Sequence, residues 1–183
     1  MRDEDLADRL TRLRKARGLT LEDLAASSGV SRASLSRIER AQISPTAATL
    51  GRLAAAFGLS VAELFAGVAV SEAALQTREA QAVWRDPETG FVRRVLSPST
   101  PGFRGSLIEG CLPAGAEIAY PVPPVADLEH HLVLLEGVLE LSLADETYRL
   151  KPGDGVRFRL RGPSRYRATG ARAARYILCA IAP

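Results

Sequence analysis

The sequence predicts a two-domain α + β protein, with helices in the N-terminal part and only strands in the C-terminal part. In residues 1–66, apolar side chains recur every three or four positions, the period of a helix buried along one face. From Val83 onward the period falls to two, and glycine, proline and β-branched residues become frequent. Residues 67–80 are alanine, glycine and polar residues with weak periodicity. We therefore expect a helical domain over 1–66, a linker over 67–80 and a β domain over 81–183.

Length and composition allow this division. A chain of 183 residues is long enough for two small domains, and 46% hydrophobic with 25% charged residues is typical of a soluble globular protein. No apolar run approaches the roughly 18 residues of a membrane span, and the first residues lack the order of a signal peptide. We therefore expect a cytoplasmic protein with no membrane partner. The formal net charge of +3 is only weak evidence for a nucleic-acid partner.

The first two helices are predicted from leucine spacing and from end signals. In residues 3–16, leucines three or four positions apart line one face, with acids in the first turn and bases in the last, as the helix dipole favours. Thr20, followed three residues later by Asp23, resembles a cap that starts a second helix over 20–26. Gly29 can adopt the left-handed conformation that ends it.

A third helix, capped by Ser31, carries the side chains on which the functional prediction depends. Leu35 and Ile38 lie three positions apart and must face the core. This leaves four side chains pointing outward: Arg32, Ala33, Ser36 and Arg37. Arginine can bond both acceptors of a guanine, and a small residue lets the backbone approach closely, so these are suitable side chains for a DNA recognition helix. They would also suit a solvated surface, and the surrounding helices favour the recognition helix.

Two more helices complete the predicted helical domain. Ser44 and Pro45 are expected to open a fourth helix, with the proline at its first position and an apolar stripe that continues to Gly58. Ser60 and Glu63 form a capping box for a short fifth helix. The sequence thus predicts five short helices joined by tight turns.

Short motifs follow one another along these helices: T-x-x-D-L-A, G-V-S, L-S-x-I-E-R and S-P-T. Through them, residues 6–65 resemble the helix-turn-helix domain of the Xre family, whose fold is shared with lambdoid phage repressors. The resemblance implies contacts to base edges from Arg32, Ala33 and Arg37. It also implies phosphate contacts from a set of hydroxyl side chains: Thr20, Ser31, Ser34, Ser36, Ser44 and Thr46.

Two positions depart from the family pattern. Leu21 occupies a position where the family often has a glutamine that touches DNA, so one familiar contact is missing. Ala41 occupies a position that is often glycine. A left-handed alanine there costs on the order of 1 kcal/mol, unless the turn differs slightly.

The C-terminal part is predicted to be an all-β sandwich or barrel. Short segments with period-two alternation are separated by turn residues at regular spacing, as in the turn from Asp86 to Gly90. The candidate strands are 82–85, 90–96, 104–112, 118–121, 130–135, 138–144, 147–150, 155–160, 164–169 and 175–181.

Three pieces of this part share one resemblance: the hairpin from Val133 to Leu141, the L-x-P-G-D turn ending at Asp154, and the turn at Gly115. Together they are similar to the cupin family, whose fold is a double-stranded β-helix or jelly-roll barrel. The resemblance spans about residues 82–182. It implies the fold and says little about a ligand.

Metal-binding cupins use a His-x-His pair, a glutamate and a later histidine as ligands. The resemblance assigns these positions to Pro123 and Val125, to His130, and to Ser164. Three of the four ligands are therefore absent, and we expect no bound metal and no other cofactor. Nothing in the chain resembles a nucleophile with a neighbouring base, so we expect no catalytic residue.

His130 and His131 are adjacent in a predicted strand and must point to opposite faces. The register places His130 inside the barrel, where it either lines an effector pocket or is a satisfied core histidine, and His131 on the surface. Three polar-tipped side chains are further candidates for an effector-binding barrel mouth: Arg104, Tyr120 and Tyr166.

A row of arginines follows along a later strand. Arg157, Arg159 and Arg161 alternate with apolar residues and therefore share one face of it. This face suits solvent, and an anionic ligand, a partner chain or the DNA backbone stay open as alternatives.

These features predict a sequence-specific DNA-binding transcriptional regulator and not an enzyme. One such domain buries too little surface for selective binding, so two copies are expected to read half-sites of a palindromic double-stranded DNA operator about one helical turn apart. The cupin-like domain would hold a homodimer together, bind a small-molecule effector, or both. Two alternatives stay open: a cupin-type metalloenzyme with an appended DNA-binding domain, and an antitoxin-like autorepressor without an effector.

Overall fold

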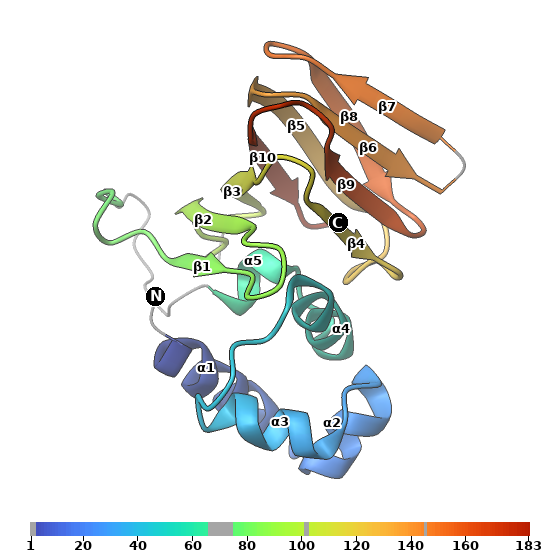
Figure 1. The fold of residues 1–183 in the computed structure, drawn as a ribbon. Helices are drawn as coiled ribbons and strands as arrows, with labels where there is room; N and C mark the ends of the chain where they lie inside the picture. The colour runs from blue at the N-terminus through green and yellow to red at the C-terminus, as the bar shows by residue number, and fades with distance from the viewer. Residues whose placement is uncertain (1–2, 66–74, 101–102, 145) are drawn as a thin grey trace.

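The computed structural model describes residues 3–65, 75–100, 103–144 and 146–183 (Figure 1). Helices form the N-terminal part and strands the C-terminal part, as the sequence predicts. Of the predicted linker over 67–80, residues 67–74 lie outside the described residues. No helix of the described chain is long and apolar enough to cross a membrane.

The helical part comprises four helices and one further helical turn within the described residues. They are α1 (Asp3–Ala16), α2 (Leu21–Ser28), α3 (Arg32–Glu39), α4 (Ala47–Phe57) and the single turn α5 (Val61–Leu64). Thr20 and Ser31 cap α2 and α3 as predicted, and Thr20 shares a reciprocal capping box with Asp23. Figure 1 shows α4 and α5 between α1–α3 and the strands.

The predicted start of α4 is wrong, because the helix begins at Ala47 and not at Pro45. The hydroxyl of Thr46 accepts a hydrogen bond from the amide of Thr49 at 3.2 Å and so caps the helix. Thr46 itself is extended, with φ −73° and ψ 166°. Pro45 therefore lies in the connection that precedes the helix.

A largely buried ion pair holds α3 against α1. The Nε and Nη2 atoms of Arg14 donate to the two carboxylate oxygens of Glu39 at 2.7 and 2.8 Å. Arg14 also donates from Nη1 to the carbonyl of Leu19 at 2.9 Å. The hydrogen bond to Glu39 is the main cause that raises the pKa of Arg14. Because Leu35 and Ile38 are buried on the same helix, α3 is fixed both by its apolar face and at its C-terminal end.

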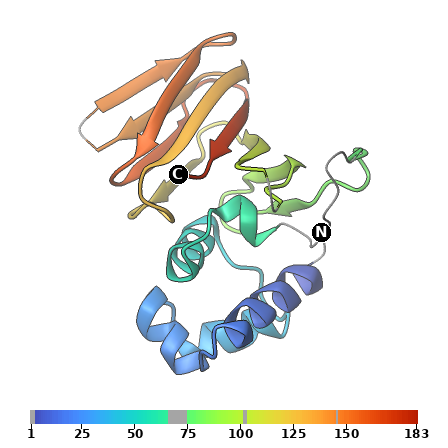
Figure 2. The ribbon, with the colours of Figure 1, turned by 180° about the vertical axis from the view of Figure 1, so that it is seen from behind.

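The strands pair antiparallel in two sheets within the described residues. They are β1 (Val83–Arg85), β2 (Val92–Ser97), β3 (Gly105–Leu112), β4 (Glu117–Tyr120), β5 (Leu128–Glu136), β6 (Leu139–Leu143), β7 (Glu146–Leu150), β8 (Gly155–Leu160), β9 (Ser164–Ala168) and β10 (Ala174–Ile181). Sheet A has the order β1-β2-β3-β10-β5-β8, and sheet B the order β4-β9-β6-β7. Figures 1 and 2 show the sheets facing each other, in agreement with the predicted cupin-like fold.

Side chains from alternate positions fill the space between the two sheets. On β5, Leu132 and Leu134 are buried, whereas Val133 faces outward. Glycine makes room for one large ring, because a Cβ atom at Gly110 would lie 2.3 Å from Cζ of Tyr176. The interior is therefore packed mainly by side chains, and the space left open is small.

The carboxylate of Asp86, in the turn between β1 and β2, joins the strands to the helices. Asp86 is buried, and its Oδ2 accepts a hydrogen bond of 2.6 Å from the amide of Ala47, the first residue of α4. Its Oδ1 accepts from the amides of Glu88 and Thr89 at 2.8 and 2.9 Å. A carboxylate at this position satisfies a free helix amide and is favoured by the helix dipole.

Two packing contacts lie beside this hydrogen bond. The Trp84 ring on β1 lies 6.3 Å from the ring of Phe65, which follows α5, and 6.3 Å from that of Phe91, which precedes β2. On α4, Gly51 faces the ring of Tyr120 on β4, and a Cβ atom at Gly51 would lie 2.8 Å from Cδ1 of that ring. The absence of a side chain at Gly51 thus allows Tyr120 to pack directly on α4.

His130 is a titratable side chain buried between the sheets. It is 7% exposed and points inward, as the sequence register predicts. Its ring meets the ring of Phe158 edge-on at 5.2 Å. Burial, followed by the charges of Arg93 and His131, lowers the pKa of His130 from 6.5 to about 3. His130 is therefore neutral at pH 7.

Replacing the junction carboxylate tests its contribution to stability. Asp86→Ala leaves the buried amide of Ala47 without its acceptor and removes a charge-assisted hydrogen bond, so the free energy of unfolding should fall by about 2–4 kcal/mol. Glu88→Ala, which removes an exposed acid from the same turn, should change it by less than about 0.5 kcal/mol. Urea unfolding measures both values, and equal small effects would contradict a structural role for Asp86.

The burial of His130 predicts a dependence of stability on pH. Between pH 6.5 and 3 the unfolded chain binds a proton at this residue and the folded chain does not, so stability falls as the pH falls through this window. The slope approaches about 1.4 kcal/mol per pH unit. His130→Gln removes this contribution, and urea unfolding at pH 7 and pH 5 should show wild type losing more stability than the variant. His131→Gln, on the outer face, is the matched control. An equal loss in wild type and His130→Gln would show that His130 is not held neutral.

Candidate functional site

The outward face of α3 has the composition predicted for a reading surface. Arg32, Ala33 and Arg37 are exposed, and Leu35 and Ile38 are buried beneath them. Figure 1 shows α3 on the side of the helical part away from the sheets. No strand therefore stands between this face and a duplex that approaches it.

Three of the six hydroxyl side chains predicted to contact phosphates serve as helix caps in this structure. Thr20 and Thr46 cap α2 and α4, and the Ser31 hydroxyl accepts from the amide and donates to the hydroxyl of Ser34. Ser44 differs, because its hydroxyl oxygen is buried and has no hydrogen-bond partner among the described residues. In this conformation that oxygen is not presented to a phosphate. Ser36 is half-buried on α3.

The structure also shows the surroundings of the predicted base-contacting residues on α3 and the two positions that depart from the family pattern. Arg32 forms an exposed ion pair with Glu22 of α2, whereas Arg37 forms no ion pair with a described residue. Leu21, at the position where the resemblance leads one to expect glutamine, packs partly buried against the helical core. Ala41 adopts a φ of 54°, so the turn after α3 keeps the left-handed conformation despite the absence of glycine.

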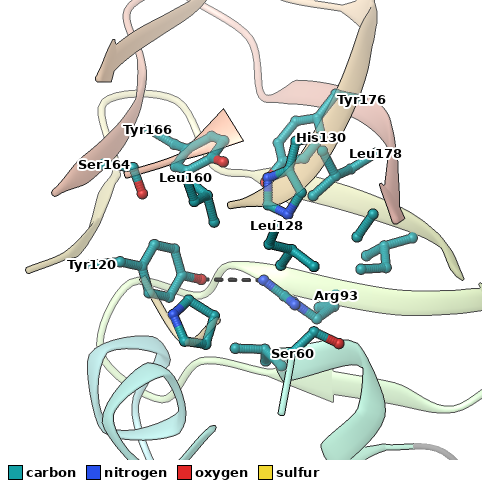
Figure 3. Close-up of a pocket in the computed structure, with 14 residues that line it drawn as sticks. Ser60, Arg93, Tyr120, Leu128, His130, Leu160, Ser164, Tyr166, Tyr176 and Leu178 are labelled. Carbon is teal, nitrogen blue, oxygen red and sulfur yellow. Dashed lines mark hydrogen bonds between the residues drawn. The ribbon is translucent and has the colours of Figure 1, made fainter. Parts of the chain in front are cut away.

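A cavity lies where the sheets meet the helical part (Figure 3). Its volume is about 40 Å³, whereas one water molecule needs at least roughly 10–15 Å³. Polar lining residues come from both parts of the molecule: Ser60, Arg93, Tyr120, His130, Ser164, Tyr166 and Tyr176. The remaining lining residues are apolar, and no carboxylate is among the described residues that line the cavity.

Two buried nitrogen groups face this cavity without full hydrogen bonding. Arg93, 8% exposed, donates from Nη2 to the hydroxyl of Tyr120 at 3.2 Å (Figure 3), and its Nε atom has no partner among the described residues. The Nδ1 atom of His130 is likewise buried and without a partner there. Since native proteins rarely leave buried polar atoms unpaired, these atoms indicate a site for something polar.

The tyrosines beside them stay protonated at neutral pH. Burial is the main cause that raises the pKa of Tyr166 and of Tyr176. Their rings stack on one another with centroids 6.1 Å apart. Each phenol group can therefore act as a hydrogen-bond donor toward the cavity.

The predicted effector residues are only partly brought together. Tyr120, His130 and Tyr166 line this cavity, whereas Arg104 is not among the residues that line it. Arg104 lies exposed just before β3 and donates to the carbonyl of Ala182 at 3.2 Å, because β3 pairs there with the end of β10. Alternation alone could not distinguish this edge position from the interior.

Sequence reasoning missed Arg93, Tyr176 and Ser60. Arg93 alternates with the buried residues Phe91 and Val95, so the period-two pattern places it inside the barrel, and this signal was available. Tyr176 has the same signal on β10. Ser60 had none, because its approach to the strands depends on how α5 packs.

The described residues include no group of three or more His, Cys, Asp or Glu side chains that could hold a metal ion. His130 is the one histidine that faces the cavity, and Ser164 lies at the later ligand position of the cupin resemblance. A single neutral imidazole with hydroxyl groups is a poor donor set for a catalytic metal.

The row formed by Arg157, Arg159 and Arg161 faces solvent, which is one of the alternatives that the sequence left open. Arg159 donates to Glu129 at 3.1 Å, and Arg161 pairs with Asp127 at 2.7 Å. Arg157 is exposed without an ion pair to a described residue. Exposed pairs of this kind contribute little to stability.

Comparison with known proteins places these features in a family. Residues 10–64 match the helix-turn-helix family HTH_3. The chain is 32% identical over 154 residues to the HTH-type transcriptional regulator SutR of Escherichia coli (strain K12). The aligned residues cover 84% of this chain and 81% of the relative.

Two solved structures share the fold. An HTH_3 family transcriptional regulator from Vibrio cholerae matches with a TM-score of 0.80 and 24% identity, covering 100% of this chain and 98% of the other. Hydroxypropylphosphonic acid epoxidase from S. wedmorenis matches with a TM-score of 0.51 and 16% identity, covering 98% of each chain. Together with the motifs on α2 and α3, the identity to SutR over most of both lengths shows that this chain belongs to the HTH_3 (Xre) family of helix-turn-helix transcriptional regulators.

Proposed function

We propose that the chain is a sequence-specific regulator in which residues 1–66 read DNA and residues 81–183 form a sensing and dimerising domain. The observation that carries the proposal is the exposed set Arg32, Ala33 and Arg37 on a helix whose opposite face is buried. Two guanidinium groups on one face suit the paired acceptors of guanines in the major groove. The exposed ion pair of Arg32 with Glu22 holds it only weakly, so DNA can replace it.

The reading surface is proposed to work as a homodimer on a palindromic operator. The outer face of sheet A supports this, because Leu107, Val133 and Leu135 are 40%, 44% and 37% exposed there. An ion pair lies on the same face, between Arg175 of β10 and Glu109 of β3. An apolar patch with charges of both signs can meet a second copy of itself about a two-fold axis.

Effector sensing is proposed for the cavity between the two parts. Ser60 and Val61 at the start of α5 line it together with strand residues, so a ligand there would touch both parts. Tyr120 contacts α4 through its ring, which lies against Gly51. A ligand that moves this ring therefore has a direct mechanical route to α4.

The enzyme alternative rests on the fold alone. Hydroxypropylphosphonic acid epoxidase has a similar architecture at 16% identity, but an enzyme that acts through a metal would need a donor set here. The cupin ligand positions hold Pro123, Val125 and Ser164, none of which suits a catalytic metal. Stoichiometric iron, manganese or zinc in the purified protein would favour the enzyme. An antitoxin-like autorepressor would be favoured by a protein that binds its operator and responds to no small molecule.

The reading role of α3 is tested on an operator selected from random-sequence DNA. Arg32→Ala and Arg37→Ala should each weaken operator binding by about 1–3 kcal/mol and relax the preference at one base pair, since each removes a bond to a base edge. Fluorescence anisotropy at fixed salt measures both affinities. Arg157→Ala, which removes an equally exposed arginine from the sheets, is the control and should bind like wild type. An equal loss on operator and on random DNA would instead make the two residues phosphate contacts.

The dimer face is tested by placing a charge in its apolar centre. Val133→Glu should convert a dimer into a monomer in sedimentation velocity, because each copy would bury an unpaired carboxylate at the two-fold contact. Val122→Glu makes the same change at an exposed position outside the strands and should leave the dimer intact. A wild-type monomer at micromolar concentration, or a dimer that survives Val133→Glu, would rule out this interface.

A further inference from the structure

Arg93 carries a buried charge that the protein does not neutralise. Its side chain extends from β2 into the cavity, and it forms no ion pair with any described residue. The contacts that the structure gives it are the Tyr120 hydroxyl, at 3.2 Å from Nη2, and the ring of Phe91, whose centroid lies 6.0 Å from Cζ. Both partners are neutral, so a full positive charge is left in a largely water-excluded space.

The same chain shows how a buried arginine is otherwise accommodated. Arg14 is nearly as inaccessible, and Glu39 neutralises it through two hydrogen bonds of 2.7 and 2.8 Å. A buried charge without such a partner is costly and usually marks a site where a counter-ion binds. The contrast suggests that the partner of Arg93 comes from outside the chain.

The polar groups around Arg93 can all donate a hydrogen bond, and no carboxylate is among the described residues that line the cavity. Figure 3 shows the guanidinium of Arg93, the ring of His130 and the hydroxyls of Tyr120 and Tyr166 around a common space. His130 is neutral and offers at most one N–H, while the phenol of Tyr166 stays protonated. A ligand with several acceptor oxygens and a negative charge matches this set, whereas a cation does not.

We propose that the cavity binds a small anion, either a carboxylate or an inorganic oxyanion, with the Arg93 guanidinium as its counter-ion. The free volume of about 40 Å³ limits the ligand to a few non-hydrogen atoms unless side chains move. An arginine can hold either class through two parallel hydrogen bonds. The regulatory meaning of this site rests on the proposed function, but the binding itself does not.

The position of Arg93 also gives the anion a route to the DNA-reading part. Arg93 donates to Tyr120, and the ring of Tyr120 packs on Gly51 of α4. An anion that takes the Nη2 hydrogen bond competes with the Tyr120 hydroxyl and frees this ring to move. Any shift of the ring is transmitted to α4, because there is no side chain at Gly51 to absorb it.

The experiment compares small anions with neutral molecules of the same shape on the full chain. Acetate is paired with acetamide, and sulfate and phosphate with dimethyl sulfone, at constant ionic strength set with potassium chloride, whose anion is neither a carboxylate nor an oxyanion. At 100 times its dissociation constant, a bound anion should raise the melting temperature by roughly 5–10 °C. Acetate and the inorganic ions separate the two ligand classes. Equal shifts from a neutral partner, or no shift from any of these anions, would overturn the proposal.

Variants at Arg93 assign the effect to its charge. Arg93→Gln should lose the anion-dependent shift, Arg93→Lys should retain a weaker one, and the matched control Arg157→Gln should behave as wild type. If Arg93→Gln does not fold, the comparison of anion and neutral molecule on wild type still decides. A shift that persists in folded Arg93→Gln would contradict the assignment.

Operator binding distinguishes the two proposals. If the protein binds its operator through Arg37 but binds no anion, the proposed anion site is overturned and the proposed DNA-binding function stands. If the protein binds an anion but its affinity for the operator does not change, the anion site stands and its proposed role as an effector site is overturned.

Discussion

The hydrogen bond from the first amide of α4 to the buried carboxylate of Asp86 is the contact on which the rest of this structure depends. It satisfies a helix amide that would otherwise lack a partner, with an acceptor supplied by a turn of the β part. The ring contacts of Trp84 with Phe65 and Phe91, and the packing of Tyr120 on Gly51, lie at the same junction. Because the two parts meet there, Ser60 and Val61 of the helical part can complete a cavity made mostly by strands.

The molecule thereby separates two tasks that have different physical needs. The reading face of α3 must be exposed and rigid, and it is held from behind by Leu35, Ile38 and the ion pair of Arg14 with Glu39. A sensing site needs unsatisfied groups in a protected space, and Arg93 and His130 supply them between the sheets. α4 packs against β4 and α2, and α2 packs against α3, so occupancy of the cavity can change the presentation of α3 through α4 and α2.

Much of this architecture follows from local sequence signals. The change of period from three or four to two separates helices from strands, and the register correctly predicted that His130 points inward. Tyr120 and Tyr166 were proposed for the site only because of their polar tips. The start of α4 was misplaced because Pro45 was expected to be the first helical residue, whereas the hydroxyl of Thr46 caps the helix one residue later. Asp86 looked like an ordinary turn residue, since its partner Ala47 lies in the other part of the chain. Arg104 was proposed for the site because of its polar tip alone, whereas Arg93 was overlooked although the alternation along β2 places it inside.

Because the helices and the sheets share this junction, they should unfold as one cooperative unit. Guanidinium unfolding tests this prediction, with the fluorescence of Trp84, the one tryptophan of the sequence, recorded alongside far-ultraviolet ellipticity, which is dominated by the helices. The structure predicts coincident transitions with one midpoint, because Trp84 lies at the junction between the two parts. Loss of helix at a lower guanidinium concentration than the change in Trp84 would show that the parts unfold independently, and would contradict the route from cavity to recognition helix.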